Sequence, residues 1–567
     1  MKYQPESILR CPKEGRYIFL LILFGFILMS LPEIATATRC LVPELPRPHE
    51  PYALTKARLE SAGLWQRTHD VNRVPPSDPQ VGDTWLWYIW DLGGYPVATL
   101  KPCTVRGRGQ YCYVVVDDDE WNVTIDQDDV DRIVQHFDRQ SVGNFPDQGI
   151  WDLNTSHFGD PPNPLDNLER IFLLYYRFNI SADGYFWYFD QYPDGTFAFA
   201  SNEADVIYLA TDSGEPASNY MLAVCAHEFE HLIHFNQDTN EDTWLDEGLG
   251  ELAMWLFGNP DIISSFNSQP DNSLTDWGAN WADYIQTYLW TLYVYEQYGG
   301  QPMIWDLIHN PANGMPSYQQ TLTSLGYSVT MENIFGDWSI ANFLDDTSIP
   351  DGQYGYTGDT LPPFYAFRTH NSYPAAGSGS VTNWATDYIR LADFTGTPTL
   401  DFNGIDSRDF RVAMMATDPM LPTLVRYVLL DEFNDGYLAF TDAQGYEEVV
   451  VAIANVYPST GATYSYTVDA VVTDVRDTPQ INISLHSHPN PFNPTTELNF
   501  SLAQKGHARL GIYDMRGRKV AQLADEELPA GMHQFSWDAK TLPSGHYLAS
   551  LEVNGQFISR VKLALVK

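Results

Sequence analysis

Basic residues are scarce in this sequence. Lys and Arg account for 32 of its 567 residues and Asp and Glu for 73, which gives a formal net charge of −41. Because such a polyanion repels nucleic acid and anionic lipid, we expect neither as a partner. The acidic excess would favour solubility or hold structural Ca²⁺, and composition does not separate the two. The acidic run at Asp126 misses the EF-hand spacing, so we interpret it as the N-terminal cap of a helix.

Long hydrophobic runs are also nearly lacking. One extends from Tyr17 to Leu31, which is shorter than the ~20 residues that a membrane-spanning helix needs. Basic residues precede this run, and Ala35-Thr36-Ala37 follows it as an A-x-A cleavage site. This pattern is typical of a secretory signal peptide. We therefore expect an exported protein with no integral membrane segment in its mature form.

Cysteine is rare, with five residues in the chain, of which Cys11 would leave with the signal peptide. Cys103 and Cys112 flank TVRGRGQY, whose two glycines permit a tight turn. In an oxidising compartment this arrangement predicts a hairpin disulfide, and two free thiols are the alternative. Cys225 is expected to be a buried thiol. Cys40 is not expected to carry a lipid, because no small-residue box precedes it.

The most informative segment is CAHEFEHLIHF. Apolar residues recur around it with helical spacing, so His227 and His231 should share one face of a helix. Two imidazoles at this spacing can bind one tetrahedral Zn²⁺, which in catalytic sites takes a third protein ligand and leaves one position open. Glu247, in the downstream segment TWLDEGLGELA, is the expected third ligand.

Two further glutamates suit the chemistry of such a site. Glu228 follows His227 directly, about 100° around the helix, which places its carboxylate beside the metal rather than on it. There it can take a proton from a metal-activated water and pass it to the departing amine. Glu251 shares the helix face of Glu247 and is predicted to accept the other ring N–H of a ligand histidine.

A short HExxH pattern also arises by chance, and the downstream WLDEG makes it more specific. The alternative is that Glu228 and Glu247 are solvated carboxylates and the histidines are core residues. His234 is expected to pack rather than to bind metal, because a metzincin would have glycine there and histidine at Gln237. The ligand set favours zinc without excluding cobalt or manganese.

At this point the chain resembles a known group. HEFEH followed by WLDEG resembles the gluzincins, metallopeptidases whose third zinc ligand is a glutamate. SNEADVIYL, YLWTLYVYEQYGG and IFGDWSIANFLDD are similar to secreted bacterial peptidases of the hyicolysin type, and the resemblance covers about residues 80 to 345. It implies His227, His231 and Glu247 as ligands and Glu228 as the base.

The resemblance also implies a tyrosine that donates a hydrogen bond to the oxyanion of the transition state. The segment DYIQTYLW offers Tyr284 as the first choice and Tyr288 as the second. The alternative is that this aromatic stripe is only helix core.

Residues 196–209, TFAFASNEADVIYL, alternate apolar and polar side chains. This pattern predicts a half-buried edge strand that can pair with an extended peptide substrate. Within it, Glu203 lies where aminopeptidases of the same clan have a glutamate that binds the free amino terminus. Because the GxMEN motif of those enzymes is missing, we favour an endopeptidase and keep an exopeptidase open.

The order of elements predicts the architecture. Strand-like segments before the zinc motif and helices after it indicate α+β. The expected fold class is multidomain α+β, with a zincin-like peptidase of mixed sheet and helical subdomain followed by two Ig-like β-sandwich domains. The expected parts are a signal peptide (1–37), a Pro-rich linker or pro-segment (38–80), the peptidase (81–345), an irregular connection (346–376), an accessory β-sandwich (377–476) and a C-terminal sandwich (483–567).

The C-terminal part carries a second resemblance. HPNPFNPTTELNFSL, ARLGIYDMRGRKVAQL, LPAGMHQFSWDAKTLPSGHYLASLEV and RVKLALVK resemble the C-terminal sorting domain of type IX secretion cargo. The resemblance implies an interaction with the type IX secretion machinery, transport across an outer membrane, and attachment or release at the surface. An ordinary adhesive or spacer sandwich is the alternative.

These observations favour a secreted zinc endopeptidase that acts on extracellular proteins or peptides. A catalytically inactive surface adhesion or scaffold protein is one alternative. An aminopeptidase of the same clan is the other.

Overall fold

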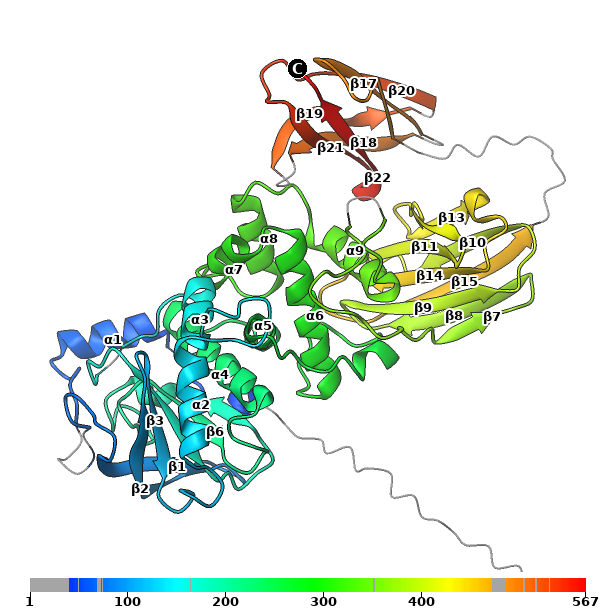
Figure 1. Cartoon of the computed structure of the whole chain (residues 1–567). Coiled ribbons are helices and arrows are strands. Elements are labelled where there is room, and N and C mark those ends of the chain that lie inside the picture. Colours follow the sequence, from blue (N-terminus) through cyan, green and yellow to red (C-terminus); the bar gives the residue numbers. More distant parts are fainter. Residues whose placement is uncertain are drawn as a thin grey trace, which may run out of the picture. The chain divides into compact units, whose positions relative to one another are not determined.

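The computed structural model describes residues 40–48, 50–68, 73, 75–163, 165–349, 352–471, 485–502, 505–514, 518–529 and 531–567. The expected signal peptide, residues 1–37, lies outside the described residues. The chain forms a mixed α+β structure with several sheets (Figure 1). Across the described part of the chain, no helix combines the length and the apolar character needed to cross a membrane.

The first sheet has six strands in the order β1-β2-β3-β4-β6-β5. β3, β4 and β6 run parallel, whereas β5 pairs antiparallel with β6 at one edge. The continuous apolar sequences of these parallel strands fit their complete burial. The strands are β1 (Thr84–Asp91), β2 (Val97–Arg108), β3 (Cys112–Asp117), β4 (Ile171–Tyr176), β5 (Gly184–Phe186) and β6 (Val206–Ala210).

Helices precede, interrupt and follow the strands of this sheet along the chain. The predicted N-cap at Asp126 is confirmed, because its side chain accepts hydrogen bonds from the backbone N–H groups of Asp128 and Asp129. Ser218 caps the helix that carries the histidine motif. The helices are α1 (Tyr52–Ser61), α2 (Gln127–Asp138), α3 (Ile150–Phe158), α4 (Asn219–Gln237), α5 (Thr243–Phe257), α6 (Trp281–Gln297), α7 (Gln301–Ile308), α8 (Met315–Ser324) and α9 (Met331–Leu344).

The predicted disulfide between Cys103 and Cys112 is wrong. The two cysteines do lie on a hairpin, but Cys103 pairs with Asp117, whereas Arg108 pairs with Tyr113 next to the turn. At ~3.3 Å per residue, the stretch from Cys112 to Asp117 places Cys103 roughly 16 Å along the strand from Cys112, and a disulfide needs Cα atoms within about 7 Å. Both are buried free thiols, as are Cys40 and Cys225.

The prediction of one long edge strand over residues 196–209 is also wrong. Only Val206–Ala210 forms a strand, β6, and it lies inside the sheet between β4 and β5. Phe197 and Phe199 instead pack against Phe189, with ring centroids 5.2 and 4.8 Å apart. Glu203 has a φ of 53°, which interrupts an extended run. The edge strand next to β6 is β5.

The C-terminal part is rich in β-strands. A four-stranded and a five-stranded sheet share one hydrophobic core, and β7 and part of β8 fall in the range expected to be irregular. Their strands are β7 (Arg368–His370), β8 (Ala375–Val381), β9 (Ala385–Ala392), β10 (Thr397–Gly404), β11 (Phe410–Asp418), β12 (Leu421–Tyr427), β13 (Asp435–Ala439), β14 (Glu448–Asn455) and β15 (Ala462–Val471).

A further three-stranded and four-stranded sheet share another core. Their strands are β16 (His486–His488), β17 (Thr495–Leu502), β18 (Gly506–Asp514), β19 (Lys519–Leu528), β20 (Gly531–Asp538), β21 (Gly545–Val553) and β22 (Gln556–Leu565).

Candidate metal centre

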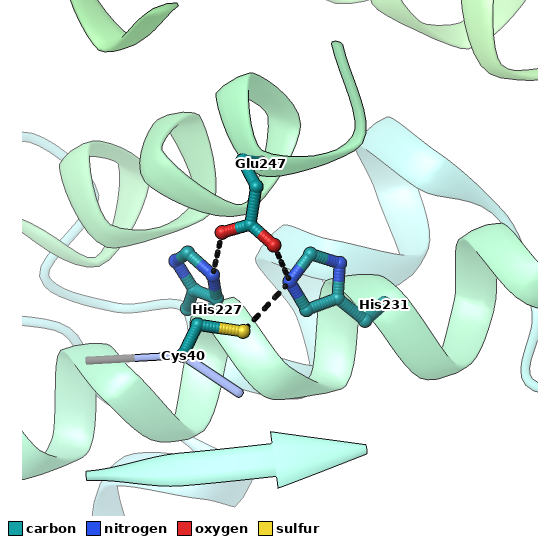
Figure 2. A group of neighbouring side chains, drawn as sticks. All are labelled: Cys40, His227, His231 and Glu247. Carbon is teal, nitrogen blue, oxygen red and sulfur yellow. Dashed lines mark hydrogen bonds and ion pairs between the residues drawn. The ribbon is translucent and has the colours of Figure 1, made fainter. Parts of the chain in front are cut away.

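Helix α4 carries both motif histidines on a buried face. His227 and His231 are 3% and 2% exposed, and their ring centroids are 4.8 Å apart. Glu247 comes from α5 and is completely buried. Its carboxylate points between the two rings (Figure 2). The structure therefore brings together the three side chains that the sequence predicts as ligands.

The spacing of these atoms fits a cation. Nε2 of His227 is 3.3 Å from Oε2 of Glu247, and Nε2 of His231 is 3.4 Å from Oε1. In a tetrahedral zinc site with bonds of about 2.0–2.1 Å, ligand atoms lie ~3.4 Å apart. Nε2 of His227 and both oxygens of Glu247 are buried and have no hydrogen-bond partner among the described residues. A single cation would satisfy all of them.

Two glycines let the backbone approach these side chains. A Cβ on Gly250 of α5 would lie 2.8 Å from ring atoms of His227. A Cβ on Gly184, the first residue of β5, would lie 2.7 Å from Cγ of Glu228. Both distances are too short for real contacts, so each position needs glycine. The edge strand β5 therefore passes directly against the motif glutamate.

A fourth side chain completes the cluster, and the sequence analysis missed it. Cys40 lies just before a short 3₁₀ helix (Val42–Glu44). Its Sγ is 3.4 Å from Nε2 of His231. The ligand atoms of Cys40, His227, His231 and Glu247 all lie within 4.8 Å of one another. Because Cys40 and His231 are 191 positions apart, no local sequence signal could have revealed this contact.

Glu228 lies beside the cluster rather than within it, as its helix position predicts. It is completely buried, and its Oε2 is 3.8 Å from Sγ of Cys40. Burial raises the pKa of Glu228 to about 7, and the nearby histidines oppose that rise. The carboxyl group is thus next to the candidate ligands and able to exchange a proton there.

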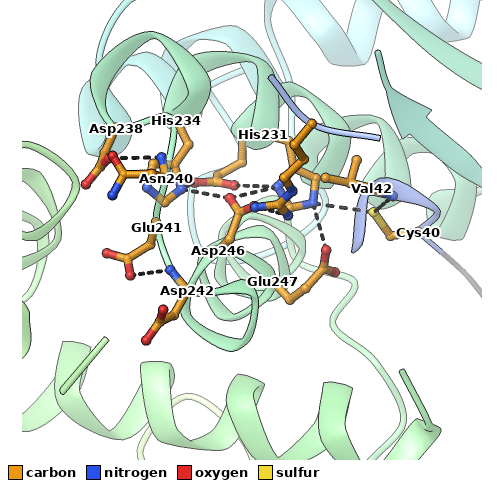
Figure 3. Close-up of polar contacts among 12 residues, drawn as sticks. Cys40, Val42, His231, His234, Asp238, Asn240, Glu241, Asp242, Asp246 and Glu247 are labelled. Carbon is orange, nitrogen blue, oxygen red and sulfur yellow. Dashed lines mark hydrogen bonds and ion pairs between the residues drawn. The ribbon is translucent and has the colours of Figure 1, made fainter. Parts of the chain in front are cut away.

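Asp246 holds the far side of His231. Its Oδ1 is 3.2 Å from Nδ1 of His231 and 2.9 Å from Nδ1 of His234 (Figure 3). Burial would raise the pKa of Asp246, but the charges and contacts of these two histidines hold it well below its usual range. A carboxylate on the far ring nitrogen orients the imidazole and leaves Nε2 for a metal. The sequence analysis missed this residue, although it directly precedes Glu247 in WLDEG.

Glu251 lies on the other side, at His227. Its Oε1 is 3.7 Å from Nδ1 of His227. This separation is longer than a hydrogen bond, although it matches the side of the ring that the sequence analysis assigns to Glu251. The role of Glu251 stays a prediction.

Replacement of Asp246 by asparagine is expected to weaken zinc binding about 10- to 100-fold, because the carboxylate that orients His231 is lost. Titration against a competing chelator measures this affinity. Asp242→Asn is the matched control, since Asp242 precedes α5, is exposed and makes no side-chain cap. Equal zinc affinity in Asp246→Asn and wild type would contradict the orienting role.

The two candidate tyrosines differ in the group to which each hydroxyl donates its hydrogen bond. The Tyr284 hydroxyl donates a hydrogen bond to the carbonyl oxygen of Cys40 at 3.2 Å, so it reaches the cluster. The Tyr288 hydroxyl donates instead to Oδ2 of Asp359 at 2.6 Å. Of the two, only Tyr284 therefore presents its hydroxyl to the backbone next to the candidate ligands.

Glu203 is completely buried in the loop before β6. Its carboxylate accepts hydrogen bonds from the backbone N–H of Thr68 at 2.9 Å and of Asp194 at 2.8 Å. It is not one of the side chains that gather around His227 in the described structure.

His234 is buried, as its predicted packing role requires. Burial alone would lower its pKa, but the contacts with Asp246 and Glu230 raise it to about 10. Glu230, His234 and Asp246 form a second group that could hold an ion. The predicted structural Ca²⁺ stays a prediction.

Comparison with known proteins identifies the C-terminal region. Residues 487–565 match the family described as a secretion system C-terminal sorting domain. The resemblance noted for this segment is confirmed. The protein is accordingly type IX secretion cargo, exported to the cell surface or the extracellular space.

The other two comparisons do not show a family for this chain. A search of curated proteins finds no match. Solved structures that match include three Bacteroides uniformis β-glucuronidases. An apo β-glucuronidase 3 is 12% identical over 35% of this chain and 28% of that chain, with a TM-score of 0.12. A β-glucuronidase 2 covalently bound to cyclophellitol-6-carboxylate aziridine is 11% identical over 38% and 29%, with a TM-score of 0.12. A third is 11% identical over 38% and 29%, with a TM-score of 0.11.

This chain thus spans less than a third of the length of these enzymes. TM-scores this low carry no argument about fold or function. The interpretation as a zinc peptidase therefore depends on the residues and their geometry.

Proposed function

We propose that this protein is a secreted zinc endopeptidase of the gluzincin type, with a zincin-like catalytic unit followed by two Ig-like domains. One observation carries the proposal. His227, His231 and Glu247 converge from two helices with ligand-atom separations of 3.3 and 3.4 Å, and Glu228 lies beside them.

Each residue has a defined task in this proposal. His227, His231 and Glu247 would hold the zinc, and a bound zinc ion would acidify a water molecule and polarise a substrate carbonyl. Glu228 accepts a proton from that water and later returns it to the departing amine. Tyr284 donates a hydrogen bond to the substrate oxygen on which negative charge develops.

The sheet edge supplies the binding surface for the peptide. β5 is the edge strand of the first sheet, and its Gly184 lies against Glu228. An extended peptide that pairs with β5 through backbone hydrogen bonds would therefore present a peptide bond to Glu228.

An endopeptidase is favoured over an aminopeptidase. The carboxylate of Glu203 accepts a hydrogen bond from the backbone N–H of Asp194, outside the N-terminal segment, and it lies outside the cluster of candidate ligands. Nothing in that arrangement supports a requirement for a free substrate amino terminus.

A catalytically inactive scaffold is the second candidate. Cys40 favours it, because a zinc ion with four protein ligands has the closed coordination typical of structural sites. Removal of Cys40 is therefore part of the test.

The zinc-loaded protein, or its Cys40→Ala variant, is expected to cleave internally quenched peptides blocked at both ends. Chelation should lower the rate at least ~100-fold, because the zinc-activated water is lost, and added Zn²⁺ should restore it. Cleavage that survives chelation would refute the zinc mechanism. No cleavage by either zinc-loaded protein would favour the scaffold.

A further inference from the structure

The N-terminal segment (residues 40–48 and 50–68) contacts nearly every part of the candidate catalytic centre. Sγ of Cys40 lies 3.4 Å from Nε2 of His231, and its carbonyl oxygen accepts from Tyr284. The backbone N–H of Leu41 donates to the carbonyl oxygen of Gly184 at 3.4 Å. A single short stretch of chain thus meets a candidate ligand, the candidate oxyanion donor and the sheet edge.

The thiol of Cys40 lies where a zinc ion held by His227, His231 and Glu247 would take its fourth ligand. Nε2 of His227 and the two oxygens of Glu247 are buried, lack hydrogen-bond partners among the described residues, and face the same space as the thiol (Figure 2). With bonds of about 2.3 Å to sulfur and 2.0–2.1 Å to nitrogen, tetrahedral zinc separates S from N by ~3.6 Å. The separation between Cys40 and His231 is close to that value.

The backbone around Cys40 lies where the proposed substrate would lie. Cys40 forms a parallel β-bridge with Gly184, at the start of the edge strand β5. Its carbonyl group takes the hydrogen bond of Tyr284, as a substrate carbonyl would in the proposed mechanism. The segment therefore covers the metal position and the peptide-binding edge together.

Additional contacts hold the segment in place. Leu41, Val42 and Leu45 are buried. Arg47 forms an ion pair of 3.3 Å with Asp246, the same carboxylate that contacts His231. Farther along, Thr68 donates its backbone N–H to Glu203.

We propose that Cys40 is a fourth, removable ligand of the zinc and that the N-terminal segment keeps the peptidase latent until it is displaced. On binding, the thiol releases its proton to solvent water and coordinates as a thiolate. The predicted signal cleavage after Ala37 leaves Cys40 in the exported chain. The latency rests on the proposed peptidase function, whereas the ligation of zinc by Cys40 can be tested without it.

Zinc X-ray absorption of the zinc-loaded full chain tests the ligation directly. Wild type should show one sulfur neighbour at about 2.3 Å in addition to nitrogen and oxygen at about 2.0–2.1 Å. Cys40→Ala should lose the sulfur neighbour and keep the others. Cys103→Ala is the matched control, since Cys103 is another buried free thiol on β2, outside the cluster.

Peptide cleavage tests the latency. Cys40→Ala should raise kcat/KM for an internal peptide bond at least ~10-fold, because a tethered competitor acts at an effective concentration of about millimolar. Cys103→Ala should match wild type. If Cys40→Ala does not fold, a specific protease site inserted at the exposed Ser77 allows the segment to be cut away after folding, with the same two readouts.

The outcomes separate the two claims. Wild-type zinc without a sulfur neighbour overturns the role of Cys40, and chelator-sensitive cleavage would then leave the peptidase standing. A sulfur neighbour with equal cleavage by wild type and Cys40→Ala overturns the latency. In a third outcome, zinc has a sulfur neighbour but wild type, Cys40→Ala and the cut protein all fail to cleave peptide. This result refutes the peptidase and therefore the latency. Cys40 would then be a ligand of a structural zinc.

Discussion

Replacement of Glu228 by glutamine is expected to lower kcat/KM for an internal peptide bond by about 10³-fold and to leave the zinc content unchanged. Glutamine keeps the shape of the side chain but cannot take up the proton. Since Glu228 lies beside the candidate ligands and not among them, all of them remain in place. The effect of Glu228→Gln on the cleavage rate is measured in two backgrounds, wild type and Cys40→Ala. In the Cys40→Ala background, the proposed latency does not mask the effect.

Glu241→Gln is the matched control for this substitution. Glu241 is also a buried carboxyl group whose pKa is raised by burial to about 7, but it accepts from the backbone N–H of Gly314 at 2.7 Å, away from the cluster. Its activity should stay near that of wild type. An equal loss in both variants, or a loss of zinc from Glu228→Gln, would contradict the assignment of Glu228 as the base.

Replacement of Glu247 by glutamine is expected to lower the zinc affinity by about 10²- to 10³-fold. Zinc sites in small domains hold the ion with about 10–16 kcal/mol shared among their ligands, and a neutral amide is a far weaker ligand than a carboxylate. The variant should also lose most of the zinc-dependent rise in Tm, because ligand-linked stabilisation falls with affinity. Chelator competition and thermal unfolding with and without zinc measure the two effects.

Glu251→Gln is the comparison variant for Glu247→Gln, with a smaller expected loss of zinc affinity. Its carboxylate lies 3.7 Å from the far nitrogen of His227 and would only support the ligand, so its loss should cost at most about 10- to 100-fold in zinc affinity. A larger loss of zinc from Glu251→Gln than from Glu247→Gln would reverse the assignment of the third ligand.

The local part of the site could be predicted from the sequence. The spacing of His227 and His231 fixes them on one helix face, and the structure places both on α4 with Glu247 between them. The cap at Asp126 depends on neighbouring residues only, and it is confirmed. Sequence patterns within one or two helical turns predict contacts reliably, because the backbone geometry of the helix alone brings the residues together.

Predictions that required long-range register did not succeed. The hairpin between Cys103 and Cys112 exists, yet the pairing places Cys103 opposite Asp117, and the printed sequence does not specify that register. The alternation of apolar and polar residues over 196–209 predicted a strand. Two of its apolar residues, Phe197 and Phe199, instead lie in a loop and pack against Phe189.

Cys40 shows most clearly that contacts between distant parts of the chain cannot be predicted from the sequence. Its thiol contacts His231 across 191 positions, whereas the sequence predicts that the segment carrying it is a Pro-rich linker or pro-segment. Only the fold brings this segment to the edge strand β5. The same applies to Arg47, whose ion pair with Asp246 joins the N-terminal segment to α5.

The match to a C-terminal sorting domain suggests a reason for the contacts between the N-terminal segment and the candidate catalytic centre. The protein is exported to the cell surface or the extracellular space, and a peptidase on that route would act on the proteins around it if it were active from the start. A ligand carried on the N-terminal segment would keep it inactive during transport.

Anomalous diffraction at the zinc absorption edge, on crystals of the zinc-loaded protein, tests the central claim most directly. The account predicts one strong peak among Nε2 of His227, Nε2 of His231 and the carboxylate of Glu247, at about 2.0–2.2 Å from each. A crystal with no peak there, or with its peak among Glu230, His234 and Asp246 instead, would contradict it.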